Sequence, residues 1–130
     1  MTLTLVQRWF DKLPPYEVDL PLLMVAGVAY TPRTALSEAQ RNTALGQTLQ
    51  AMIERRSVGT LTSEEDTLAR LRLQELLKRA PEKPLFATLA LPPRTYTPSD
   101  LLREVQQGTP VGQQWISAEK IQMRYLVGLR

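Results

Sequence analysis

Apolar residues recur at helical spacing in three long stretches of the chain. Residues 2–13 predict an amphipathic helix whose apolar face is formed by Leu3, Val6, Phe10 and Leu13. Residues 62–80 predict a second helix, which opens with the capping-box pattern Thr62-Ser-Glu-Glu and carries the stripe Ala69, Leu73, Leu76, Leu77 and Ala80. Prolines follow both segments, as is typical where helices end.

The third stretch, residues 110–127, is the most apolar and carries two stripes rather than one. The first stripe consists of Val111, Trp115, Ala118, Ile121, Tyr125 and Leu129, and the second of Ile116, Met123, Leu126 and Val127. A helix that is apolar on two sides is either central in a core or part of an interface. We therefore predict a protein interface formed by Trp115, Ile116, Met123, Tyr125, Leu126 and Leu129.

The chain resembles itself at an offset of 66 residues. Between residues 30–47 and 96–113, nine of eighteen positions are identical, where chance would give about one. In each copy a threonine followed by a proline predicts a helix start, at Thr31-Pro32 and Thr97-Pro98. Asn42 and Gly108, which tolerate a left-handed backbone, predict the end of that short helix and a corner.

A second helix should start directly after each corner. Thr43 and Thr109 can cap it, because a threonine hydroxyl accepts a hydrogen bond from the first-turn amides. Gly46 and Gly112 fall in its first turn, where glycine costs up to ~1 kcal/mol relative to alanine. A glycine at the same place in both copies predicts a close approach of two backbone segments, at the point where the copies cross.

These patterns predict one mainly α domain over residues 1–130, with α+β as the alternative. Two internally duplicated helix–corner–helix units, about 18–56 and 84–124, would be related by a pseudo-twofold axis and joined by the helix 62–80. Residues 21–29 and 84–91 are either two short strands or extended connections. As strands, they could pair with each other across the axis.

Composition removes several kinds of chemistry. The chain has no cysteine and no histidine, so thiol nucleophiles, imidazole bases and most transition-metal sites are excluded. We expect no catalytic residues, no cofactor and no metal. The longest apolar run, Leu20–Tyr30, is too short to span a bilayer as a helix. It does not follow a basic segment either, so we expect an unprocessed cytoplasmic protein with no membrane span.

Two carboxylates, Glu38 and Glu104, occupy matching positions in the two copies. If they face each other across the axis, they could form a shared cation site or an acid–base pair, as in a carboxylate-based hydrolase. The other interpretation is that each lies on a solvated helix or pairs with an arginine. The hydrolase is the weakest of three functional hypotheses.

Nucleic-acid binding is the principal alternative function, because twelve of the sixteen cations are arginine and the net charge is +3. The phosphate contacts would come from Arg41, Arg55, Arg56, Arg70, Arg72 and Arg79. A helix-turn-helix reader is disfavoured, since charged residues such as Glu38 and Glu104 occupy first-helix positions that should be small or apolar.

The favoured hypothesis is a non-enzymatic protein-interaction module: a subunit, adaptor or assembly factor. Its apolar helical surface, mostly from residues 110–130, would bind a protein partner, which could be a second copy of the chain in a homodimer.

Overall fold

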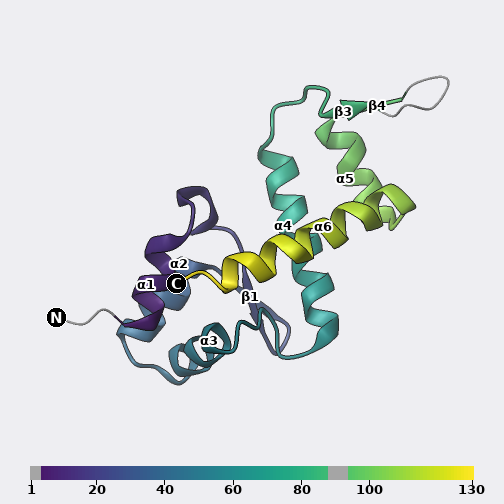
Figure 1. Ribbon diagram of the computed structural model, residues 1–130. Coiled ribbons are helices and arrows are strands. Elements are labelled where there is room, and N and C mark those ends of the chain that lie inside the picture. Colours follow the sequence, from purple (N-terminus) through teal and green to yellow (C-terminus); the bar gives the residue numbers. More distant parts are fainter. Residues whose placement is uncertain (1–3, 88–93) are drawn as a thin grey trace.

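The protein is mainly α-helical with two short strand pairs, as the computed structural model shows for residues 4–87 and 94–130 (Figure 1). The described elements are α1 (Leu5–Lys12), the 3-10 turn η1 (Pro15–Glu17), β1 (Leu23–Val25), β2 (Val28–Tyr30), α2 (Pro32–Gln40), α3 (Ala44–Glu54), α4 (Thr62–Arg79), β3 (Phe86–Ala87), β4 (Thr95–Tyr96), α5 (Pro98–Gln107) and α6 (Pro110–Val127). The predicted fold class is confirmed.

The chain runs twice through one order of elements: a helix, a strand pair and two further helices. We call residues 5–54 the first unit and residues 62–127 the second unit. Since α4 packs on α5 and α6 as α1 packs on α2 and α3, the helix predicted as a connector is part of the second unit. Gene duplication and a pseudo-twofold axis stay predictions.

The strands pair within each unit and not across an axis between the copies. β1 and β2 form an antiparallel hairpin around Ala26 and Gly27, both of which have positive φ angles. β3 pairs with β4 in the same way, with Phe86 opposite Tyr96. Residues 88–91 of the predicted extended segment lie outside the described residues.

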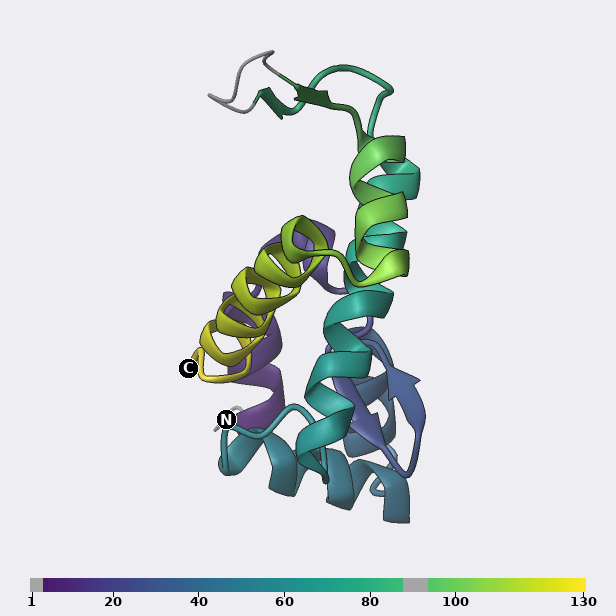
Figure 2. The same cartoon turned by 90° about the vertical axis from the view of Figure 1, so that its right-hand side faces the viewer.

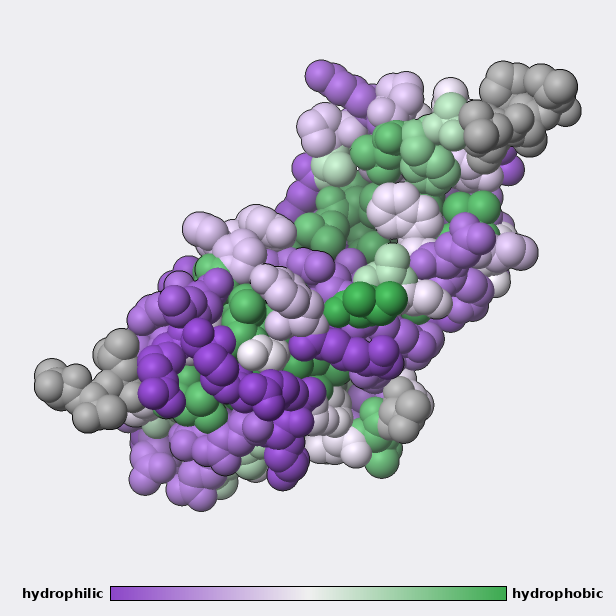
Figure 3. Space-filling view, in the orientation of Figure 1, coloured by the Kyte–Doolittle hydropathy of each residue, from purple (hydrophilic) through white to green (hydrophobic). Residues whose placement is uncertain are grey.

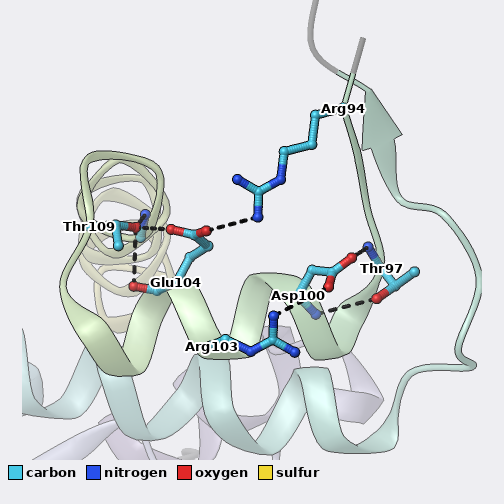
Figure 4. Close-up of polar contacts among 7 residues, drawn as sticks. Arg94, Thr97, Asp100, Arg103, Glu104 and Thr109 are labelled. Carbon is cyan, nitrogen blue, oxygen red and sulfur yellow. Dashed lines mark hydrogen bonds and ion pairs between the residues drawn. The ribbon is translucent and has the colours of Figure 1, made fainter. Parts of the chain in front are cut away.

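The two corners have the same geometry. Asn42 and Gly108 adopt left-handed backbone angles, with φ of 53° and 68°. The hydroxyl of Thr43 accepts a hydrogen bond from the amide of Gly46 and donates one to the Glu38 carboxylate. In the second unit, Thr109 makes the same two bonds with Gly112 and Glu104 (Figure 4).

The matched glycines let two consecutive helices meet at each corner. A Cβ added to Gly46 would lie 2.5 Å from the carbonyl carbon of Glu38, and one on Gly112 would lie 2.6 Å from that of Glu104. Both contacts are too short for a real Cβ. The close approach is therefore between α2 and α3, or α5 and α6, and not between the two copies as predicted.

A buried ion network joins the two units. Arg72 of α4 is fully buried and forms a two-pronged pair with Glu17, at 2.9 and 2.7 Å. It also bonds Glu119 of α6 at 2.7 Å and donates to the carbonyl of Pro21 at 2.9 Å. Nearby, the indole N–H of Trp9 donates to the carbonyl of Leu126 at 2.9 Å, which fixes α1 against α6.

A second buried carboxylate, Glu64, holds the first hairpin against the start of α4. It accepts hydrogen bonds from the backbone amides of Gly27, Thr60 and Leu61. The N-cap residue is Leu61, one residue earlier than the capping-box pattern predicts, because Glu64 rather than Glu65 reaches back. The hydrogen bond from the Thr60 hydroxyl, followed by that from Gly27, lowers the pKa of Glu64 from its usual 4.5.

We predict that Gly112→Ala destabilises the protein by about 1–3 kcal/mol, because the new methyl group overlaps the backbone of α5. Helix propensity alone would give the opposite sign, a gain of up to ~1 kcal/mol. Urea unfolding measures the difference, with Gln114→Ala on the exposed face of α6 as the control. Equal or greater stability of Gly112→Ala would show that the corner is not tightly packed.

We predict that Glu64→Gln narrows the pH range over which the protein gains stability. A carboxyl with a lowered folded-state pKa stabilises the fold fully above its unfolded pKa, and that contribution is lost as the pH falls through the folded value. The difference in free energy of unfolding between wild type and Glu64→Gln should thus be constant above pH 4.5 and shrink below it. Denaturant titrations at several pH values test this, and a gap independent of pH would contradict it.

Candidate interaction surface

Equivalent strands in the two units differ sharply in burial. Register against the partner strand equates Leu23 with Phe86 and Met24 with Ala87. Leu23 is 0% exposed and Met24 is 2% exposed, whereas Phe86 is half-buried and Ala87 is exposed. Leu85, next to Phe86, is 46% exposed. The second unit therefore presents a strand that the first unit encloses.

The first strand is covered by residues 57–59, which we call the covering segment. The amide of Met24 donates to the carbonyl of Val58 at 2.8 Å, and Met24 forms a parallel β-bridge with Gly59. The Val58 side chain is 3% exposed and belongs to the same core as Leu23 and Met24. A short extended piece of chain thus completes the first unit.

No described segment plays this part beside β3. Helix α3 ends at Glu54, and the chain turns back at Arg56, which has a positive φ of 55°. At the 66-residue offset Glu54 corresponds to Lys120, yet α6 continues to Val127. Within the described residues, β3 pairs with β4 alone.

An aromatic stack lies beside the exposed strand. The rings of Tyr96 and Phe86 are stacked with centroids 4.7 Å apart, and those of Phe86 and Trp115 are 5.6 Å apart. The guanidinium of Arg94 lies 4.7 Å from the Tyr96 ring and also pairs with Glu104 at 3.4 Å (Figure 4). Stacking holds Phe86 and Trp115 in place while leaving both incompletely covered.

Hydrophobic side chains gather where the C-terminal half of α4, β3 and the N-terminal half of α6 meet (Figure 3). Incompletely buried apolar residues of these elements include Leu76, Leu85, Phe86 and Trp115, and we call these four the apolar patch. Figure 2 shows that β3 and β4 project from the end of the molecule formed by the second unit, away from α1, α2 and α3.

Positive charge is concentrated in the same part of the chain. Residues 1–74 contain eight cations and eight anions, whereas residues 75–130 contain eight cations and five anions, so the net charge of +3 falls in the latter. Lys78, in the last turn of α4, and Lys83, two residues before Leu85, are exposed. Neither forms an ion pair within the described part of the chain.

The predicted interface residues of α6 fall into two groups. Ile116, Met123 and Leu126 are at most 1% exposed, so they belong to the core and their assignment to an interface is corrected. They are buried because α6 packs on α4, α5 and, through Leu126, on Trp9. Of the other three, Tyr125 is 63% exposed, and Trp115 and Leu129 are half-buried.

Sequence reasoning missed Leu85 and Phe86 as surface candidates. Their apolar run resembles that of residues 21–29, and both runs were treated alike. The signal that separates them is the difference in length between α3 and α6, which decides whether a covering segment can form.

The arginines proposed to bind phosphate do not act as one set. Arg72 is fully buried among carboxylates, so it cannot reach a phosphate and is removed from that set. Ion pairs within α2 and α4 engage Arg41, Arg70 and Arg79. Arg55 and Arg56 remain exposed at the end of α3.

The carboxylates Glu38 and Glu104 are not brought together. Each accepts a hydrogen bond from the threonine of its own corner and pairs with an arginine of its own unit, Arg41 or Arg94. The described residues contain no group of three or more side chains able to hold a metal ion. They also contain no helix long and apolar enough to cross a bilayer.

Comparisons with protein-family models, curated proteins and solved structures found no match to this chain. A functional conclusion must therefore come from the surface itself, where the second unit leaves exposed what the first unit buries.

Proposed function

We propose that this chain is a non-enzymatic protein-interaction module that binds a protein partner through the apolar patch of the second unit. The observation that carries the proposal is the contrast between equivalent positions. Leu23 and Leu49 are fully buried, whereas their counterparts Phe86 and Trp115 are only partly covered. Covering apolar surface releases about 25 cal/mol for each Å² removed from water, which favours a partner at this place.

The residue types of the patch also support binding to protein. Aromatic residues and arginine are enriched in the centres of protein interfaces, where they account for much of the binding energy. Here Phe86 and Trp115 are fixed by stacking, so little side-chain freedom would be lost when a partner covers them. Arg94 and Lys83 would lie at the polar rim.

We predict that a photo-crosslinking amino acid at position 85 captures a protein in cells of the source organism. Leu85 is 46% exposed within the patch, and Tyr16, which is 62% exposed on η1, gives a matched control position. We expect a discrete adduct heavier than 14.7 kDa from position 85 and not from position 16.

The additional substitution Trp115→Ala should reduce the yield of this adduct, because it removes the ring that borders Phe86. An adduct of twice the chain mass would identify a second copy as the partner. Circular dichroism establishes that each variant is folded. Equal labelling from positions 85 and 16, or no adduct from a folded chain, would overturn the proposal.

A further inference from the structure

We infer that the partner binds the second unit as an extended strand that adds to the free edge of β3, with an apolar side chain against Phe86 and Trp115 and acidic residues beside the strand. This inference rests on the proposed function and specifies the partner's chemistry. Main-chain hydrogen bonds to a free sheet edge are a recurring mode of peptide recognition, in which side-chain pockets give the specificity.

The first unit supplies the pattern for this mode of binding. There, the covering segment lies parallel to β1, receives the Met24 amide at Val58 and buries the Val58 side chain in the core. Its sequence, Ser57-Val58-Gly59, is short and has one apolar residue between two small ones. An equivalent segment beside β3 would meet Ala87, the counterpart of Met24, from the side away from β4.

The second unit has room for a larger side chain than valine. In the first unit the covering segment faces a core of aliphatic residues that include Leu23 and Leu49, both fully buried. In the second unit the same two positions carry Phe86 and Trp115, whose stacked rings are incompletely buried. We therefore expect a β-branched or aromatic residue at the central position of the bound strand.

Charge complementarity selects among such strands. Lys83 lies two residues before Leu85, Lys78 ends α4, and neither is neutralised by an ion pair in the described part of the chain. The loop that joins β3 to β4, residues 88–93, contains no acidic residue. Aspartate or glutamate on both sides of the apolar position would therefore be attracted, and lysine or arginine repelled.

The experiment uses a phage-displayed library of random twelve-residue peptides, selected on the full chain. We expect the enriched peptides to share a short apolar run with β-branched or aromatic residues and flanking acidic residues, without helical periodicity. A synthetic peptide of the enriched sequence should bind about tenfold more weakly to Trp115→Ala than to the wild type. Ile121→Ala, at a 66% exposed position of the same helix, is the control and should bind normally.

Two further measurements separate strand addition from other ways of covering the patch. Methylating alternate backbone nitrogens of the peptide should abolish binding only when they donate to β3. In ¹⁵N spectra of the chain, the amide of Ala87 should be among those that shift most. Lys83→Glu should weaken binding about tenfold and reduce its dependence on salt.

The outcomes distinguish this inference from the proposed function. Enriched peptides with helical periodicity, or binding insensitive to backbone methylation, would overturn strand addition while crosslinking at position 85 still supported a protein partner. A library without enriched peptides, together with an adduct of two chains, would overturn it in favour of self-association. Failure of crosslinking at position 85 would overturn the proposed function directly.

Discussion

One buried guanidinium holds the two halves of this protein together. Arg72 enters the core from α4 and is met by Glu17 from the first unit and Glu119 from α6, with the carbonyl of Pro21 as a further acceptor. Ions removed from water are tolerated only when their partners are all in place. Any displacement of η1 or α6 relative to α4 would leave a charge buried without a partner, so the network fixes how the units are placed.

That placement assigns a task to the second half of α6. Its last turns, with Met123, Leu126 and Val127, are buried and reach Trp9 of the first unit. The chain after α3 has no such task, because it turns back at Arg56 and lies along β1 instead. The first unit is therefore covered twice by its surroundings, and the strand pair of the second unit is left with a free edge. The exposed patch follows from the way the core is completed.

Local features of the fold could be predicted from the sequence, because their causes are local. A threonine before a helix, a residue suited to a left-handed corner and a glycine in the following turn determine each unit's backbone within about twenty residues. The buried face of α6 could not be predicted in this way. Both of its stripes have helical spacing, and only contacts with distant residues such as Trp9 decide that Ile116 and Met123 are enclosed.

The same limit applies to charged groups. Glu17, Arg72 and Glu119 are far apart in the sequence and resemble the other interspersed charges, so no pattern distinguishes them from solvated residues. Periodicity likewise cannot show that the Leu85–Phe86 strand is exposed while the Leu22–Leu23 strand is buried, since both are short apolar runs.

The residues that differ between the units are as informative as those that match. The corner pairs Thr43 and Thr109, and Gly46 and Gly112, are identical, and they perform the same backbone task. Leu49, which is fully enclosed, corresponds to the half-buried Trp115. Tryptophan suits a place that is apolar on one side and wet on the other, because its indole N–H can face water or a partner while the ring stays packed. Each unit thus keeps the residues that shape its backbone and adapts those that meet its surroundings, and in the second unit those surroundings include a face open to a partner.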